Sequence, residues 1–266
     1  MRRSSLVLTV GAAALLCATA SDAHAQRGFG RGGYDPSGFA TPYGWGGNTK
    51  YDGRFTFARI KYRGGGRGAG WAHDFPRAET HFMHIIRSIT SVRPFVEAGP
   101  VVGGNIIALD DPDLMKYPVS YLSEPGGWYP NDKEVLGLRN YLLKGGFVII
   151  DDFDGGAMQQ DWYHFSEEMR KVLPGSRIIE VPQSHPIFDS FFKIDFEKLV
   201  AYRTGDRPGY FGIFQDNDPR KRVMMIINFN QDIGDYWEWS DRGFNLVPSN
   251  EAYKLGVNYL IYALTH

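Results

Sequence analysis

Acidic side chains follow the most apolar segment of this 266-residue chain. The segment at 144–156 reads KGGFVIIDDFDGG, so four apolar residues are followed closely by Asp151, Asp152 and Asp154. An unbroken apolar run of this kind is typical of a strand that is buried on both faces of a parallel sheet. Ligands bind such sheets beyond the carboxyl ends of the strands. We therefore expect these carboxylates to lie where a binding site would be.

Two other apolar segments end in polar side chains as well. Glu124 follows the segment at 118–122, and Asn230 and Asp232 follow the segment at 222–229. If the three strands are parallel in one sheet, these groups converge on one edge of that sheet. The residues of this candidate ligand-binding rim are Glu124, Trp128, Asp151, Asp152, Asp154, Asn230 and Asp232.

The side chains of this rim are suited to two kinds of chemistry. Converging carboxylates can bind a hard cation, or they can divide into a general acid and a general base. Trp128, Trp237 and Trp239 lie near the rim in the sequence and could stack on a sugar ring. The rim therefore indicates either a binding site or a carboxylate-dependent enzyme.

Ordinary turn chemistry explains the same residues without a site. Asp154 can cap the helix that follows it, and Asp-Gly pairs are common in turns. Side chains alternate along a strand, so Asp151 and Asp152 point to opposite faces and cannot both reach one ligand. The sequence leaves both interpretations open.

The other reactive side chains do not form a recognised catalytic motif. The single cysteine is Cys17, and no G-x-S-x-G nucleophile motif is present. His81 and His84 have a spacing that could share a metal ion, but no third ligand stands at a usual distance from them. We therefore predict no catalytic residue, no cofactor and no metal ligand, with a divalent cation at the rim as the alternative.

The N-terminal part of the chain is typical of an exported protein. Two arginines, a short apolar stretch and an Ala-His-Ala cleavage pattern ending at Ala25 predict a signal peptide over 1–25. Cleavage after Ala25 would deliver the product to the periplasm or the outside of the cell. The glycine- and aromatic-rich residues 26–52 predict a flexible leader, and residues 53–266 predict one domain.

Composition limits the kinds of partner. The formal net charge is −1, and export also argues against nucleic acid as a partner. After the signal peptide no run reaches the ~18 apolar residues of a membrane span. The expected partner is therefore an unknown periplasmic protein or envelope polymer, with no nucleic acid and no membrane span in the mature chain.

Strand and helix patterns alternate along the domain. Asn131 and Glu134 have the spacing of a capping box, and Ser249 is a plausible N-cap of the last helix. Alternation of this kind predicts an α/β fold with a mostly parallel sheet, followed by a C-terminal hairpin and a closing helix. We expect strands at 55–62, 106–109, 118–122, 147–150, 177–181, 210–215 and 222–229, with helices at 76–89, 131–143, 158–172 and 249–264.

Several stretches together resemble the domain of unknown function DUF4159. They are FTFARIKY, W-x-x-D-x-P-x-x-E at 71–79, YPVSYLSEPGGW, LRNYLLKGGFVIIDDFDGG, HPIF, DYWEW and LGVNYLIYALTH. The resemblance implies a flavodoxin-like three-layer sandwich similar to class I glutamine amidotransferases. It implies no established activity.

The chain departs from active amidotransferases at the positions that matter for catalysis. Those enzymes use a cysteine at a strand–helix turn and a late His-Pro-Glu. Here the only cysteine falls in the signal peptide, and His185-Pro186 is followed by Ile187. Glutaminase activity is therefore not expected.

The functional expectation follows from the missing nucleophile and the acidic rim. We expect a non-catalytic periplasmic binding or assembly module. The alternative is a carboxylate- or metal-dependent hydrolase acting on cell-envelope glycans, because such an enzyme could use the same acids.

Overall fold

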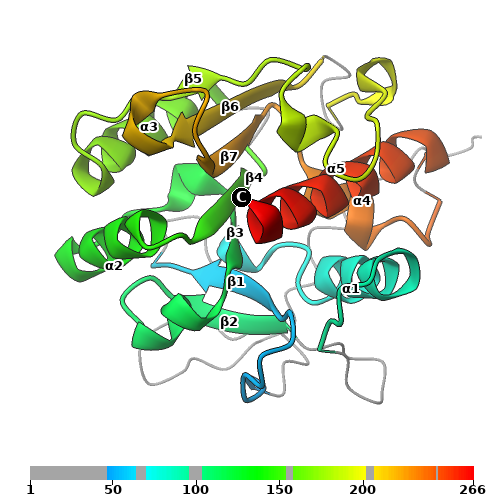
Figure 1. Cartoon of the computed structure of the whole chain (residues 1–266), viewed down its shortest axis with the longest axis horizontal. Coiled ribbons are helices and arrows are strands. Elements are labelled where there is room, and N and C mark those ends of the chain that lie inside the picture. The colour runs from blue at the N-terminus through cyan, green and yellow to red at the C-terminus, as the bar shows by residue number, and fades with distance from the viewer. Residues whose placement is uncertain (1–46, 64–69, 96–103, 154–157, 202–206, 244) are drawn as a thin grey trace, which may run out of the picture.

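A seven-stranded sheet runs through the protein (Figure 1). The computed structural model describes residues 47–63, 70–95, 104–153, 158–201, 207–243 and 245–266. The proposed signal peptide, most of the proposed leader and Asp154 lie outside the described residues.

Five of the strands are parallel, and their order is β2-β1-β3-β4-β7. Strands β6 and β5 extend the sheet beyond β7; β6 is antiparallel to β7, and β5 is antiparallel to β6. The expected α/β class with a mostly parallel sheet and a C-terminal hairpin is confirmed. The strands are β1 (Phe57–Lys61), β2 (Gly104–Ala108), β3 (Val119–Ser123), β4 (Phe147–Asp151), β5 (Ile179–Glu180), β6 (Gly209–Phe214) and β7 (Val223–Phe229).

Helices pack against both faces of the sheet (Figure 1). Residues of α2 and α3 share one apolar core with Val148 and Ile150 of β4, whereas residues of α1, α4 and α5 share the other core with Phe147 and Ile149. This alternation along β4 is the period of two that a strand imposes. The helices are α1 (Arg77–Ile89), α2 (Asp132–Leu143), α3 (Met158–Val172), α4 (Ile233–Glu238) and α5 (Leu246–Thr265).

Short 3₁₀ turns complete the connections between these elements. Two of them matter for the site, because they lie at the ends of parallel strands: η2 (Gly70–Ala72) follows β1, and η4 (Pro125–Gly127) follows β3. The others are η3 (Pro112–Lys116), η5 (Pro186–Phe188), η6 (Phe196–Lys198) and η7 (Gln215–Asn217).

Local sequence signals set most of the element boundaries. The capping box is present: Asn131 accepts from the Glu134 backbone N–H, and Glu134 accepts from the Asn131 backbone N–H. The expected N-cap at Ser249 is wrong, because α5 begins at Leu246 and Asn245 caps it by accepting from the backbone N–H of Val247. Helix α4 was not expected. Within the described residues, no helix has both the length and the apolar character needed to cross a membrane.

Candidate functional site

The ends of the parallel strands place acidic loops next to each other. In the β3–β4 register Ser123 pairs with Asp151, so Glu124 and Asp152 lie directly after neighbouring strands. The loop after β7 also contacts Asp152, because the Asp152 backbone N–H donates to the Gln231 carbonyl in that loop. Convergence of these loops on one edge of the sheet is therefore observed.

Three residues in these loops, and Asp74 just before α1, have left-handed backbone conformations. The φ angles are 62° at Asp74, 49° at Glu124, 60° at Asp152 and 54° at Asn230. Such angles are uncommon for residues other than glycine. The chain thus turns sharply after β3, β4 and β7, and just before α1. Strained backbone of this kind is concentrated at functional sites, which makes this edge of the sheet the candidate site.

Three overlapping groups of side chains at this edge bring metal-ligating atoms within 4.8 Å of one another. We call them the outer triad (His73, Glu124 and Asp152), the inner triad (Asp74, Asp152 and Asp232) and the third triad (Asp74, Asp235 and Glu238). Asp152 belongs to the outer and inner triads, and Asp74 belongs to the inner and third triads. The site is therefore one continuous cluster rather than separate surface acids.

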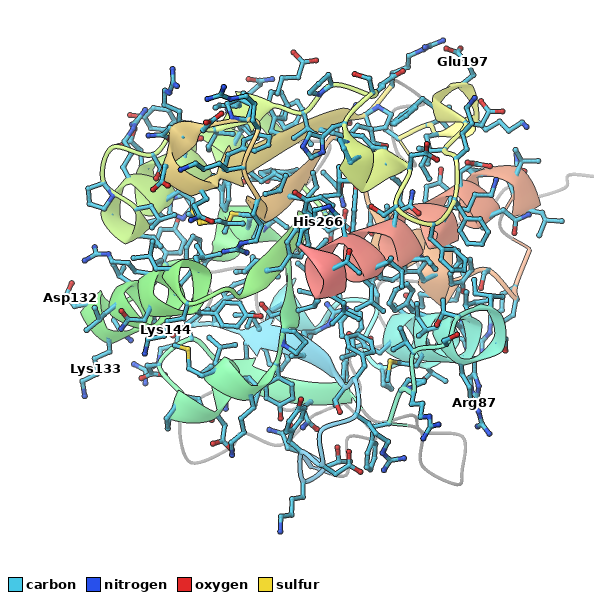
Figure 2. All side chains as sticks on the ribbon, in the orientation of Figure 1. Arg87, Asp132, Lys133, Lys144, Glu197 and His266 are labelled. Carbon is cyan, nitrogen blue, oxygen red and sulfur yellow. The ribbon has the colours of Figure 1, made fainter. Side chains whose placement is uncertain are left out.

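The inner triad is buried, unlike most charged side chains of this protein. Arg87, Asp132, Lys133 and Glu197 extend outward from the periphery (Figure 2). In contrast, Asp152 is only 5% exposed, and the other two residues of the inner triad are also buried. Like charges in a buried place disfavour ionisation, so the acids of the cluster are expected to hold protons or to bind a cation.

Asp152 has a strongly perturbed environment. Burial, followed by the charge of Glu124, raises the pKa of Asp152 to about 8, although His73 opposes the rise. Its Oδ2 atom lies 3.4 Å from the Ser123 hydroxyl, which donates to it. A carboxyl group with this pKa changes its charge near neutral pH and gives up its proton readily to a competing cation.

Asp74 lacks a partner for one of its oxygens. Its Oδ2 atom is buried and accepts no hydrogen bond within the described part of the chain. Burial, and then the charges of Asp235 and Asp152, raise the pKa of Asp74 well above its usual value. Gly234 leaves room for this oxygen, because a Cβ atom there would overlap Asp74 Oδ2. A buried carboxylate oxygen without a donor is costly unless a ligand satisfies it.

His73 and Glu124 form the more exposed end of the cluster. Their side chains are 25% and 22% exposed and make an ion pair through His73 Nδ1 and Glu124 Oε1. Burial lowers the pKa of His73, but the hydrogen bond and the charge of Glu124 outweigh it, and the net pKa is raised.

Asp151 belongs to none of the three triads and supports the fold. It is fully buried, and its Oδ2 atom accepts from the Tyr121 hydroxyl at 2.6 Å and from the backbone N–H groups of Ile233 and Gly234 at 2.8 and 3.1 Å. Its Oδ1 atom accepts from the Asn228 amide at 2.9 Å. Burial raises the pKa of Asp151 to about 6. The expected role in the ligand-binding rim is therefore corrected: these four donors occupy the carboxylate, which holds the first turn of α4.

Two of the three tryptophans expected near the rim, Trp128 and Trp237, are buried. Trp128 is fully buried and packs on Phe165 of α3, with ring centroids 6.1 Å apart. Trp237 is likewise buried and stacks on Phe82 at 4.5 Å. Neither indole can stack on a sugar at the surface, because the core covers both rings.

The remaining predicted rim residues lie after β7. Asp232 is in the inner triad, and its Oδ1 atom also caps α4 by accepting from the Asp235 backbone N–H at 2.8 Å. Burial, and then the charge of Asp152, raise the pKa of Asp232 well above its usual value. Asn230 is in the same loop but belongs to none of the three triads. Of the predicted rim, the structure thus brings together Glu124, Asp152 and Asp232.

A buried ion pair positions the loop that carries His73 and Asp74. Arg59 of β1 pairs through Nε with Glu79 of α1, and its Nη1 donates to the Trp71 carbonyl at 3.0 Å. The guanidinium also lies over the Tyr121 ring, 4.7 Å from its centroid. Arg59 thereby ties η2 to β1, β3 and α1. Its charge is paired with Glu79, and it also lowers the pKa of Asp74 in the inner triad, against the larger effect of burial.

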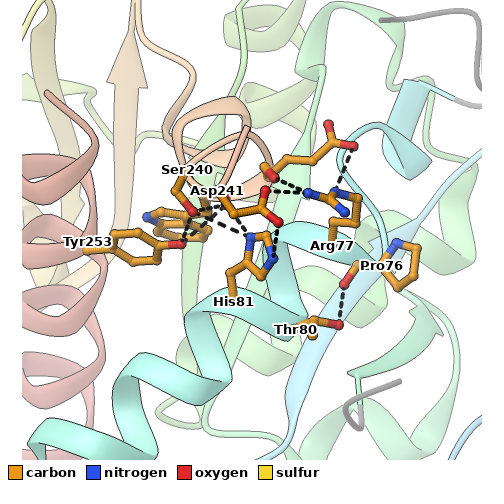
Figure 3. A network of polar contacts seen from close by, with 9 residues as sticks. Pro76, Arg77, Thr80, His81, Ser240, Asp241 and Tyr253 are labelled. Carbon is orange, nitrogen blue, oxygen red and sulfur yellow. Dashed lines mark hydrogen bonds and ion pairs between the residues drawn. The ribbon is translucent and has the colours of Figure 1, made fainter. Parts of the chain in front are cut away.

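A second polar network connects α1 to the end of α4 (Figure 3). The Arg77 guanidinium donates to the Glu238 carbonyl at 3.2 Å and to Asp241 Oδ1 at 2.5 Å. Arg77 Nε also lies 4.0 Å from Glu238 Oε1, so the third triad already faces a positive charge from the protein.

The same network contains Ser240 and His81, which do not form a catalytic pair. His81 Nδ1 lies 2.7 Å from the Trp237 carbonyl and donates to it, so this nitrogen cannot accept the proton of Ser240, 3.5 Å away. The Ser240 hydroxyl donates to the same carbonyl at 2.9 Å.

Sequence reasoning missed four members of the cluster: His73, Asp74, Asp235 and Glu238. His73 and Asp74 do not follow a strand directly, and Asp235 and Glu238 lie in the unexpected helix α4. The signal that could have found them was the pair of motifs at 71–79 and 235–239, which contain Asp74, Asp235 and Glu238.

Comparison with known proteins identifies a family. A search of curated proteins gave no match. The family model described as a domain of unknown function, DUF4159, matches residues 56–264, which include every element of the sheet and every residue of the three triads. The chain therefore belongs to the DUF4159 family.

Proposed function

We propose that this protein is an exported, non-catalytic binding module that holds a divalent cation in the inner triad and engages a periplasmic protein or envelope polymer through it. The observation that carries the proposal is the buried Asp74 Oδ2 atom, which has no hydrogen-bond partner in the described structure and belongs to the inner triad. Three converging carboxylates without a cation are unfavourable when buried. A divalent ion would satisfy this oxygen and offset the negative charge.

The donor set indicates the class of cation. The inner triad supplies carboxylate oxygens only, and such ligands suit Ca²⁺, Mg²⁺ or Mn²⁺ rather than soft metals. Three protein ligands leave coordination positions for water or for an anionic group of a partner. The support for a binding role thus comes from the clustered carboxylates of the inner triad. It does not come from aromatic stacking, because Trp128 is buried.

The arrangement of the strands supports a flavodoxin-like three-layer sandwich of the class I glutamine amidotransferase type as the fold. The parallel strands follow the order β2-β1-β3-β4-β7, which is the flavodoxin order 2-1-3-4-5 if β7 is taken as the fifth strand. Strands β5 and β6 would then be an insertion before it. Ligands of such folds bind beyond the carboxyl ends of the strands, where the cluster lies.

Asp74→Asn is expected to weaken stabilisation by the cation. After dialysis against a chelator at pH 8, Mn²⁺ or Ca²⁺ at about 100 times its dissociation constant should stabilise the parent by ~2.7 kcal/mol, or roughly 5–10 °C in Tm. The variant should show a much smaller shift, because the amide offers a weaker, uncharged ligand to the ion of the inner triad. Asp113→Asn is the matched control: this acid is exposed and pairs with Lys116. The absence of a shift in the parent with Mg²⁺, Ca²⁺ and Mn²⁺ would contradict the proposal.

A metal-dependent hydrolase acting on cell-envelope glycans is the second candidate, because a cation with open positions can also activate water. A glycosidase based on two carboxylates alone is less favoured, since the ligand atoms within each triad lie within 4.8 Å, closer than the ~5–10 Å such enzymes need. We expect no release of reducing ends from cell-wall glycan in the presence of Mn²⁺. Release that disappears in Asp152→Asn would instead identify the hydrolase.

A further inference from the structure

The outer triad has the composition of a second metal site beside the inner triad. It combines an imidazole nitrogen of His73 with carboxylate oxygens of Glu124 and Asp152, and all three ligand atoms lie within 4.8 Å of one another. Asp152 also belongs to the inner triad, and a carboxylate has two oxygens with which to bind two ions. The two positions therefore share one ligand, as in sites that hold a pair of metal ions.

The local structure keeps the outer ligands in place. Glu124 and Asp152 directly follow the paired ends of β3 and β4, so their separation is fixed by the sheet register. Gly70 leaves room for the Glu124 carboxylate, because a Cβ atom at this position would overlap Glu124 Oε2. His73 is fixed from the other side, since its backbone N–H donates to the Gly70 carbonyl at 3.0 Å.

The two positions differ in exposure and in donor type. Asp74, Asp152 and Asp232 are 5–9% exposed, whereas the side chains of His73 and Glu124 are 25% and 22% exposed. The outer position is thus the end of the cluster that a solvated ion reaches first. An imidazole with two carboxylates suits a borderline transition metal such as Mn²⁺, Co²⁺ or Zn²⁺.

The third triad does not have the same need for a cation. Arg77 lies against Glu238, 4.0 Å from its carboxylate, and donates to its backbone carbonyl. This positive charge offsets the acids of the third triad. In the described structure the inner triad forms no ion pair with a protein cation, although the charge of Arg59 lowers the pKa of Asp74, and the outer triad contains the His73 imidazole.

We propose that the cluster holds two divalent metal ions that share Asp152, with the outer ion bound by His73, Glu124 and Asp152 and the inner ion by Asp74, Asp152 and Asp232. This inference rests on the proposed cation-binding function and adds a second, nitrogen-containing position to it. The imidazole would give the outer ion a spectroscopic signature that the oxygen-only inner ion lacks.

Metal stoichiometry tests the inference directly. The full chain, freed of metal by a chelator, is titrated with Mn²⁺ by calorimetry, and bound metal is counted after equilibrium dialysis. We expect two ions per chain in the parent, one in His73→Ala and in Glu124→Gln, and one in Asp74→Asn. Asp152→Asn should bind each ion at least tenfold more weakly, because it removes the shared ligand. His84→Ala is the matched control, since His84 is an exposed histidine of α1 outside the cluster.

Two further measurements distinguish the ways in which the two-metal inference could fail. The paramagnetic resonance spectrum of the parent with Mn²⁺ should show two coupled ions, and the coupling should be lost in His73→Ala. Circular dichroism checks that each variant is folded. One bound ion that His73→Ala and Glu124→Gln leave unchanged would overturn the second position while keeping the proposed function. Two ions unaffected by these substitutions would also overturn it, and no bound ion in the parent would overturn both proposals.

Discussion

Asp151→Ala is expected to reduce the free energy of unfolding by at least ~3 kcal/mol, the largest loss among the substitutions considered for this site. Alanine removes the acceptor of four donors: the Tyr121 hydroxyl, the Asn228 amide and two backbone N–H groups of α4. A buried donor left without a partner costs about 1–3 kcal/mol. Because α4 carries Asp235 and Glu238, disorder in its first turn would also disturb the third triad.

Urea denaturation followed by tryptophan fluorescence measures this loss, since Trp237 of α4 is buried in the core. Asp151→Asn is the informative control. Its amide oxygen can still accept from Tyr121 and from the backbone of α4, so most of the stability should remain. A free energy of unfolding for Asp151→Ala within ~1 kcal/mol of the parent would show that Asp151 does not hold α4 in place.

The sheet and the general place of the site could be predicted from the sequence because both depend on local patterns. The apolar run that ends at Asp151 has the character of a central parallel strand, and β4 is indeed central, between β3 and β7. Parallel pairing then brings strand ends together without further information. Glu124 and Asp152 could be placed at one edge for this reason.

Residues whose position depends on tertiary contacts could not be predicted in the same way. Helix α4 has only the residues Ile233–Glu238, too few for a helical period to be recognisable, and Asp151 and Asp232 cap its N-terminus. His73 reaches Glu124 from the loop before α1, where Arg59 holds the Trp71 carbonyl. Such contacts between distant parts of the chain leave no periodic trace in the sequence.

Asp151 and Asp152 have different roles although they are adjacent in the sequence. Asp151 is the last residue of β4, whereas Asp152 has a left-handed backbone conformation, so strand alternation alone does not decide where the two carboxylates point. Asp151 is fully occupied by protein donors, whereas Asp152 shares a cluster with Glu124 and Asp232. Trp128 was expected in the rim because its position after two glycines resembles an exposed loop. In the structure η4 packs against α3, and this contact buries the indole.

The raised pKa values of the cluster predict how the stability of the fold depends on pH. Every resolved pKa shift within the three triads is upward, including those of Asp152 to about 8 and Glu238 to about 7. A group whose pKa is higher in the folded than in the unfolded chain stabilises the fold fully only below its unfolded pKa, and this stabilisation is lost as pH rises through the folded pKa. For Asp152 the window therefore extends from 3.8 to about 8.

Metal-free protein should consequently lose stability between about pH 4 and pH 8. The difference between about 8 and 3.8 for Asp152 corresponds to at most about 5 kcal/mol, and neighbouring carboxyls share part of it. Added Mn²⁺ or Ca²⁺ should restore the stability at pH 8, because the cation replaces the protons. Thermal unfolding in a chelating buffer across this range measures the effect, and a metal-free parent that is more stable at pH 8 than at pH 5 would contradict the argument.

Asp152→Asn should then have opposite effects on stability and binding. The amide has nearly the shape of the protonated acid but does not ionise, so at pH 8 the metal-free variant should be roughly 1–3 kcal/mol more stable than the metal-free parent. At pH 4 the two should unfold alike, which separates removal of charge from a general change in packing. Divalent cations should stabilise the parent at pH 8 and stabilise the variant much less. A variant that is less stable than the parent at pH 8 without metal would show that the Asp152 carboxylate supports the fold, as Asp151 does, rather than a ligand.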